Sequence, residues 1–237
     1  MHREVELRST PRTPAEAEPV LPCGPMPVAA EFHARHLLIF ARHPELGRVK
    51  TRLAAGVGEA AALAVYQELL AHTRAAAEAV PAHRTVWLAE APSAAAQAAV
   101  PDPWPSYAQR LQPAGDLGTR MCAAFAAAFA GGAAAALIIG TDCPGLSGEL
   151  LEEAYAALTT HDLVVGPAED GGYYLLGMKG LYEDVFLNKT WSTASVLAHT
   201  LADAERLGLA VHLLPPLRDV DDAADLAAWR AAQNARR

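Results

Sequence analysis

The sequence predicts an α/β protein with a mostly parallel β-sheet sandwiched by helices. Short uninterrupted apolar runs, of which 36–41 is the first, alternate along the chain with longer segments whose apolar residues recur at helical spacing. Strands that are covered on both faces give such runs, because helices shield both sides of a parallel sheet. With 237 residues, 52% of them hydrophobic and 19% charged, the chain can bury a core, which excludes global disorder.

The expected elements follow from residue 36 onward. The expected strands are 36–41, 85–89, 107–111, 136–140, 163–165, 173–176 and 211–214. The expected helices are 59–79, an Ala- and Phe-rich stretch that ends before the glycines at 131 and 132, a segment through Leu150, Ala154 and Leu158, one capped by Ser192 or Thr193 and stopped at Gly208, and one capped by Asp222 that runs through Trp229. This alternation indicates one domain over 36–235.

Residues 1–35 differ from the rest of the chain. Six prolines interrupt them, and the intervening residues show no apolar period. Since proline lacks a backbone donor and disfavours helix, we expect a disordered extension.

Composition also excludes several classes of protein. A net charge of −8 has the wrong sign for a protein that mainly neutralises nucleic acid or anionic lipid. Three cysteines without a CxxC pair and an N-terminus without an apolar signal core fit a reducing cytoplasm. The uncharged stretch 121–140 is broken by two glycines, so we expect no membrane span. The Ala-rich helices could pack against a second copy of the chain as easily as against the sheet, so a homo-oligomer is one expectation.

A basic loop follows the first expected strand. Arg48, Lys50 and Arg52 alternate there in an otherwise acidic chain. Ligands of such sheets bind beyond the carboxyl ends of the strands, so these cations are placed to contact a diphosphate. A solvated loop explains them equally well, and the spacing is not that of a P-loop.

Three aspartates form a candidate metal site. Asp142 follows the most apolar strand, while Asp219 and Asp221 are two residues apart and would face the same way in an extended segment. Carboxylates and phosphate oxygens suit Mg²⁺, which prefers few protein ligands. An Asx turn at Asp142 and a solvated acidic turn before the last helix are the alternatives.

A second carboxylate, Asp170, precedes Gly171 and Gly172 between two expected strands. The glycines let backbone approach a ligand closely, and the carboxylate can bind a hydroxyl or act as a base. A tight hairpin turn is the alternative. Cys143 has no recognisable histidine partner, so a buried thiol is favoured over a nucleophile.

Six segments taken together resemble a bacterial family of GT-A-type glycosyltransferases, the radical SAM/selenodomain-associated transferases, some linked to arsenosugar biosynthesis. These segments are VKTRL at 49–53, DLGTRM at 116–121, GTDCPGL at 140–146, GPAEDGGYYLLG at 166–177, WST at 191–193 and DVDDAADL at 219–226. Their order and spacing match from about residue 37 to residue 229. The family is similar to the guanylyltransferases of molybdenum cofactor and 2-phospho-L-lactate metabolism.

The resemblance implies a Rossmann-like nucleotide-diphosphosugar transferase fold, bound Mg²⁺ or Mn²⁺, and a nucleotide lying across the first loop. The roles it implies are metal binding for Asp142, Asp219 and Asp221, phosphate contacts for Lys50 and Arg52, proximity to the nucleotide for Gly118 and Arg120, and proximity to the acceptor or sugar for Asp170, Gly171, Gly172 and Trp191.

The leading hypothesis is metal-assisted glycosyl transfer from a nucleoside-diphosphate sugar to a small-molecule acceptor. Asp142 would act through the metal, and Asp170 would orient or deprotonate the acceptor. Nucleotidyl transfer, with release of pyrophosphate, is the alternative, although the first loop lacks the glycine-rich pattern of the guanylyltransferases. A non-catalytic nucleotide-binding module is a third hypothesis, because the usual DxD motif is here Asp142-Cys143-Pro144.

Overall fold

The computed structural model describes residues 34–235, so the extension expected at 1–35 lies almost wholly outside the described residues. One sheet of seven strands runs through this part of the chain, in the order β3-β2-β1-β4-β6-β5-β7. Its strands are β1 Arg35–Ala41, β2 His83–Leu88, β3 Ala108–Leu111, β4 Ala135–Ile139, β5 Leu163–Pro167, β6 Tyr173–Met178 and β7 Val211–Leu213.

The sheet is mostly parallel, as the alternation of elements predicts. The parallel pairs are β1 with β2, β1 with β4, β2 with β3, and β5 with β7. Strand β6 runs antiparallel to both of its neighbours. Strand order reverses around β1, whose neighbours β2 and β4 lead away in opposite directions, and a ligand crevice is expected at the carboxyl ends of such strands.

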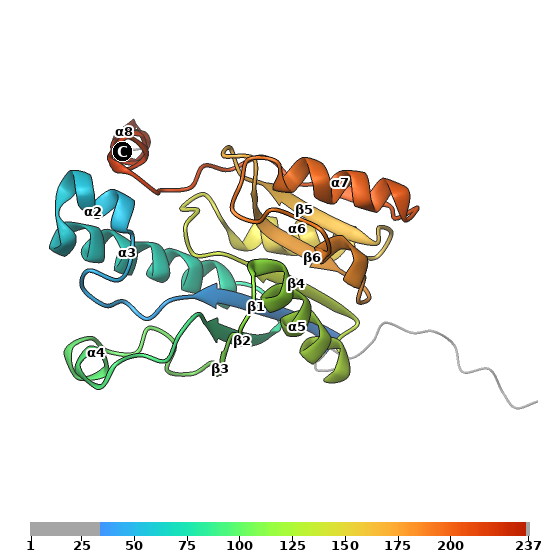
Figure 1. Ribbon diagram of the computed structural model, residues 1–237, viewed down its shortest axis with the longest axis horizontal. Helices are drawn as coiled ribbons and strands as arrows, with labels where there is room; N and C mark the ends of the chain where they lie inside the picture. The colour runs from blue at the N-terminus through green and yellow to red at the C-terminus, as the bar shows by residue number, and fades with distance from the viewer. Residues whose placement is uncertain (1–33, 236–237) are drawn as a thin grey trace, which may run out of the picture.

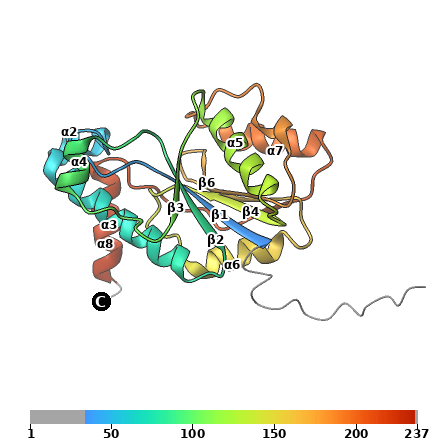
Figure 2. The same cartoon turned by 90° about the horizontal axis from the view of Figure 1, so that it is seen from below.

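Helices cover both faces of this sheet. Figure 2 shows α3 and α6 on one face and α5 and α7 on the other, while Figure 1 shows α8 beside α2. The helices are α2 Thr51–Val57, α3 Glu59–Glu78, α4 Ala94–Ala99, α5 Leu117–Ala130, α6 Gly148–Ala157, α7 Val196–Arg206 and α8 Ala223–Ala235, with a 3₁₀ turn η1 Glu183–Phe186. Helix α3, with its 20 residues, is the longest of those described, and it is not long and apolar enough to cross a membrane; nor is any other helix within 34–235.

Three apolar clusters form the core of the described residues: one lies on each face of the sheet, and a smaller one joins α2, α3 and the segment before α8 through Leu53, Leu69 and Val220. Leu37 and Ile39 of β1 pack with the side of α3 and α6, whereas Leu38 packs with the side of α5. Successive side chains of a strand point to opposite faces, so one apolar run serves the clusters on both faces. This is why the strand has no polar alternation in the sequence.

The helices differ from the prediction at three places: the start of α7, and the short helices α2 and α4. Helix α7 begins at Val196 after Ser195, so the predicted cap at Ser192 or Thr193 is wrong. Ser192 adopts a left-handed backbone with φ of 62°, and the Thr193 hydroxyl donates to the Thr190 carbonyl, outside any helix. The short helices α2 and α4 were not expected.

The cap predicted at the last helix is confirmed. Asp222 Oδ1 accepts the backbone N–H groups of Ala224 and Asp225 at 2.8 and 3.0 Å, just where α8 begins. These bonds satisfy two of the donors that a helix start leaves without partners. Asp222 is therefore a structural residue, separate in role from Asp219 and Asp221.

Candidate active site

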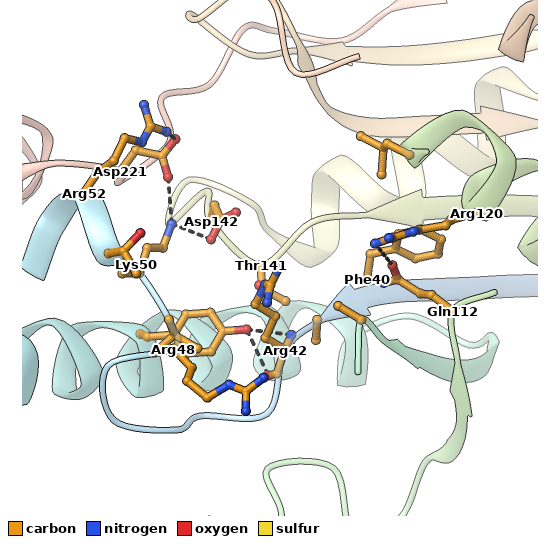
Figure 3. A pocket seen from close by; sticks show the side chains of 16 residues that line it. Phe40, Arg42, Arg48, Lys50, Arg52, Gln112, Arg120, Thr141, Asp142 and Asp221 are labelled. Carbon is orange, nitrogen blue, oxygen red and sulfur yellow. Dashed lines mark hydrogen bonds and ion pairs between the residues drawn. The ribbon is translucent and has the colours of Figure 1, made fainter. Parts of the chain in front are cut away.

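A cavity of about 550 Å³ lies at the carboxyl ends of the central strands. Segments that are distant in the sequence line it, including the loop after β1, the end of β3, the start of α5, the end of β4 and the segment before α8 (Figure 3). Its polar lining residues are Arg42, Arg48, Lys50, Thr51, Arg52, Tyr66, Gln112, Arg120, Thr141, Asp142 and Asp221. The position is the one that an α/β sheet favours for a ligand.

Lys50 joins the two acidic segments in this cavity. Its Nζ lies 2.5 Å from Asp142 Oδ1 and 3.0 Å from Asp221 Oδ1 (Figure 3). Arg52 contacts the other oxygen of Asp221 at 2.5 Å. The Val220 N–H donates to the Asp142 carbonyl at 3.0 Å, which fixes the acidic segment beside the end of β4. Lys50 and Asp221 lie 92 and 79 positions away from Asp142 along the chain, yet the three residues meet at one point.

The side chain of Lys50 is only 6% exposed, whereas that of Arg52 is 74% exposed. Val49 and Leu53, both buried, anchor the chain on either side. Burial lowers the pKa of the Lys50 ammonium, but the charges of Asp142 and Asp221 outweigh burial and raise the pKa above its usual value. Lys50 is thus a firmly charged, buried counter-ion of two carboxylates.

A second basic pair, Arg42 and Arg48, also lines the cavity. Glu90 accepts from Arg42 at 3.0 Å and from Arg48 at 2.5 Å. The Tyr66 hydroxyl accepts the Arg42 N–H at 2.9 Å and donates to the Arg42 carbonyl at 3.0 Å, so α3 holds the end of β1 in place. Two guanidinium groups therefore converge beside Lys50, in a geometry that suits phosphate oxygens.

Asp219 is the most perturbed carboxyl group of the acidic segment. It accepts a hydrogen bond from the Cys143 thiol. Burial raises the pKa of Asp219 to about 6; the thiol opposes this, and the charges of Asp142, Asp170 and Asp221 add to it. Burial also raises the pKa of the Cys143 thiol. The thiol is therefore protonated and acts as a hydrogen-bond donor, which agrees with the interpretation of Cys143 as a buried thiol.

The donor set suits a divalent ion, although its oxygens have other partners. Asp142, Asp219 and Asp221 offer the hard oxygen ligands that Mg²⁺ and Mn²⁺ take. The charges of Asp142 and Asp221 help to raise the pKa of Asp219, because the carboxylates repel one another. A bound cation would relieve this repulsion. Within 34–235, however, no three His, Cys, Asp or Glu residues are already grouped as a ligand set. Lys50 occupies the position between Asp142 and Asp221 instead.

The far side of the cavity holds Arg120, which was expected near the nucleotide. Its Nε donates to the Gly115 carbonyl at 3.0 Å, and its Nη1 lies 3.5 Å from Gln112 Oε1. Gln112 Nε2 in turn donates to the Trp87 carbonyl at 2.9 Å. Figure 3 shows this pair at the opposite side of the cavity from Lys50. The two ends can therefore contact different parts of one ligand.

Gly118 does not line the cavity, although the resemblance implies proximity to the nucleotide. It is buried in the first turn of α5, where a Cβ would overlap the indole of Trp191. Gly171, with φ of 88°, packs closely against the backbone of Ala194. The structure thus brings Gly118 and Trp191 together, and the loop before α7 covers both Gly118 and Gly171.

Asp170 lies in the hairpin between β5 and β6. Its Oδ1 accepts the Gly172 N–H at 2.9 Å, which is the hairpin-turn role that the sequence offers as the alternative to ligand binding. The negative charge of Asp170 nevertheless helps to raise the pKa of Asp219. Asp170 therefore belongs to the acidic side of the site, outside the lining of the cavity itself.

Sequence reasoning missed several residues of the site. Tyr66 lies on the buried face of α3 and shows the helical spacing of a core residue. Glu90 and Gln112 follow short strands without any motif. Arg42 had one usable signal, its position directly after β1, where side chains reach the ligand crevice.

The fold and the cavity, together with a similar solved structure, identify an α/β enzyme of the transferase type with the nucleotide-diphosphosugar transferase fold. A solved structure from Desulfovibrio desulfuricans G20, provisionally named a nucleotide-diphospho-sugar transferase, is 32% identical to the chain, with a TM-score of 0.75 over 81% of this chain and 84% of that one. The chain belongs to the family DUF2064, described as an uncharacterized protein conserved in bacteria, whose model matches residues 71–193.

More distant structures share the fold. A CMP:2-keto-3-deoxy-manno-octonic acid synthetase complexed with CTP is 11% identical, with a TM-score of 0.52 over 86% of this chain and 99% of that one. Rv0371C of Mycobacterium tuberculosis, in complex with manganese, is 15% identical, with a TM-score of 0.53 over 82% and 96%. A comparison with curated proteins found no match. These distant structures show the fold alone, whereas the 32% identical relative supports a transferase in general terms.

Proposed function

We propose that the protein is a metal-dependent transferase that uses a nucleoside-diphosphate-sugar donor to glycosylate a small-molecule acceptor. The observation that carries the proposal is the meeting of the basic loop and the acidic segments in one cavity, through Lys50, Asp142 and Asp221. A diphosphate needs cations, and a divalent ion needs carboxylates. The name of the 32% identical relative supports the same donor class, as does the resemblance of six segments to GT-A-type glycosyltransferases.

The basic residues would hold the diphosphate of the donor. Arg42 and Arg48 are poised as a pair on Glu90, and Lys50 and Arg52 follow in the same loop. Asp142, Asp219 and Asp221 would hold Mg²⁺ or Mn²⁺, which when bound would help to neutralise the leaving diphosphate. Arg120 and Gln112, at the other side of the cavity, would contact the nucleoside.

Transfer then needs an acceptor hydroxyl on the acidic side of the cavity. The hydroxyl oxygen attacks the sugar carbon, the bond from that carbon to the diphosphate breaks, and the nucleoside diphosphate leaves. Asp170 would orient the hydroxyl and take its proton, with Gly171, Gly172 and Trp191 shaping the acceptor side. The cations that hold the diphosphate stabilise the charge that develops on it.

Nucleotidyl transfer is a second candidate. Five basic residues line the cavity, and four of them, Arg42, Arg48, Lys50 and Arg52, come from the segment that follows β1, which is enough charge for a triphosphate. The fold is also shared with a synthetase whose structure contains CTP. In this reaction an acceptor phosphate attacks the α-phosphorus of a nucleoside triphosphate and pyrophosphate leaves.

Product analysis distinguishes these candidates. The full chain is incubated with Mg²⁺ or Mn²⁺, a panel of small hydroxylated and phosphorylated acceptors, and either nucleoside-diphosphate sugars or nucleoside triphosphates. Release of a nucleoside diphosphate supports glycosyl transfer, whereas release of pyrophosphate supports nucleotidyl transfer. Asp142→Asn should abolish turnover, while Glu205→Gln, an exposed change on α7, should retain it. Nucleotide binding without any turnover would indicate a non-catalytic module.

The setting of this activity is also proposed. The cysteine content of the sequence fits a reducing cytoplasm as the place of this activity.

A further inference from the structure

We propose that Lys50 makes the binding of a divalent ion conditional on the nucleotide. Without nucleotide, the Lys50 ammonium holds Asp142 and Asp221 together; when a nucleotide arrives, the ammonium moves to its phosphates and releases the carboxylates to the ion. The inference rests on the proposed function for the identity of the ligand. The geometry around Lys50 carries the rest.

The ammonium and a bridging ion need the same space. Lys50 Nζ lies 2.5 Å from one oxygen of Asp142 and 3.0 Å from one oxygen of Asp221. An ion that took these two oxygens as ligands would need the coordination sites that the ammonium now fills. Charge repulsion between an ammonium and a dication excludes a shared position as well. Occupation of this position by Lys50 and by the ion is therefore mutually exclusive.

Lys50 cannot leave the carboxylates without a new partner. Its side chain is 6% exposed, and a buried ammonium that loses its counter-ions bears a large desolvation cost. The phosphates of a nucleotide in the adjoining cavity would supply new oxygens, since Lys50 also lines that cavity. The four-carbon stem of lysine has the rotatable bonds for such a move.

The backbone at Lys50 agrees with a residue that is held in place by its contacts. Lys50 adopts φ of 48° and ψ of 47°, a left-handed conformation that is unfavourable for a residue with a Cβ. No side-chain hydrogen bond caps α2 there. Such conformations persist where the surroundings fix them, and here the ion pairs with Asp142 and Asp221 do so.

The neighbouring cations provide matched controls. Arg48 belongs to the same loop but pairs with Glu45 and Glu90 and does not touch the acidic segment. Arg52 touches only Asp221, from a side chain that is 74% exposed. Removal of either charge changes the net charge as much as removal of Lys50 does, while it leaves the position between Asp142 and Asp221 filled.

The test is a calorimetric titration of Mn²⁺ into the full chain without nucleotide. Wild type should bind Mn²⁺ weakly, and Lys50→Met should bind it at least about tenfold more tightly, because the bridging position is then open. Arg48→Met should match wild type, and Lys50→Arg, which keeps the charge, should not gain affinity. The second arm repeats the titration with saturating UDP or GDP. The nucleotide should then raise the Mn²⁺ affinity of wild type by a factor about tenfold or more larger than the factor by which it raises that of Lys50→Met. Formation of the complex between Mn²⁺ and free nucleotide affects both proteins equally, so it cancels in this comparison.

Equal Mn²⁺ affinities of wild type and Lys50→Met would overturn the proposal, as would an equal gain in Arg48→Met, which would reveal a general charge effect. Absence of Mn²⁺ binding in every variant would overturn it as well. Circular dichroism checks that Lys50→Met folds; if it does not, Lys50→Gln replaces it, and the UDP dependence of Mn²⁺ affinity in wild type, corrected for the Mn²⁺–UDP complex, still decides. Product release remains a separate test of the transferase function, so the two failures can be told apart.

Discussion

Replacement of Asp219 by Asn should change how stability depends on pH. Burial, opposed by the Cys143 thiol and reinforced by Asp142, Asp170 and Asp221, raises the pKa of Asp219 from 3.8 to about 6. Because this pKa is raised in the folded state, Asp219 contributes stability at pH values below about 3.8, and that contribution is lost as the pH rises through about 6. Asn keeps an acceptor oxygen for the thiol but does not ionise.

The size of the effect follows from linkage. A shift from 3.8 to about 6 corresponds to about 3 kcal/mol in full. Between about pH 5 and about pH 7.5, the wild type should lose about 1.4 kcal/mol of its unfolding free energy through Asp219, or about 1 kcal/mol after allowance for partial solvent access. The variant should lack this loss, while titrating groups distant from Asp219 contribute equally to both proteins.

Urea unfolding of the full chain in the presence of a chelator measures this difference. The quantity is the change in unfolding free energy between the two pH values, compared between wild type and Asp219→Asn. A variant with the same pH dependence as wild type would refute the account of Asp219 as a carboxyl group crowded by its neighbours. A control at Asp184, an exposed aspartate of η1, should show the wild-type dependence.

Three further predictions concern the packing and the charges of the site. Gly118→Ala should destabilise the protein by about 1–3 kcal/mol in urea unfolding, since the new methyl group overlaps Trp191; an unchanged midpoint would contradict this contact. Tyr66→Phe should lower the unfolding free energy by about 1–2 kcal/mol through loss of its two bonds to Arg42, and it should weaken nucleotide binding in calorimetry. Unchanged stability and affinity would contradict the role of these bonds in holding the end of β1. Arg52→Met should change stability by less than about 1 kcal/mol, because the pair is exposed, yet nucleoside-diphosphate affinity should fall severalfold, and an unaltered affinity would remove Arg52 from the phosphate contacts.

The central architecture could be predicted because its signals are local and periodic. The apolar run 36–41 predicts a strand covered on both faces, and the helical spacing of Leu63, Tyr66 and Leu70 predicts α3. Helices α2 and α4 carry no such signal. Helix α2 has seven residues with one buried side chain, Leu53, and α4 consists of alanines and one glutamine, so neither shows an apolar period. The predicted start of α7 is wrong because Ser192 and Thr193 are residue types that cap helices, whereas the chain turns there with Ser192 in a left-handed conformation.

The candidate site was predictable only where position after a strand carries meaning. Asp142 follows β4 and Lys50 follows β1, and neighbouring parallel strands bring their carboxyl ends together. The direct pairing of Lys50 with both acidic segments could not be foreseen, because it depends on how the segment before α8 crosses the end of β4. Glu90 and Gln112 act through tertiary contacts alone, which leave no pattern along the chain.

Calorimetry with nucleotides tests the central claim most directly. Nucleoside-diphosphate sugars and nucleoside triphosphates are titrated into wild type and Asp142→Asn, each with and without Mn²⁺. The account predicts at least one ligand that wild type binds about tenfold or more tightly with the ion than without it, and an Asp142→Asn protein in which this gain disappears. Nucleotide affinity that is the same with and without the ion, in both proteins, would contradict the joining of cations, carboxylates and diphosphate in one site.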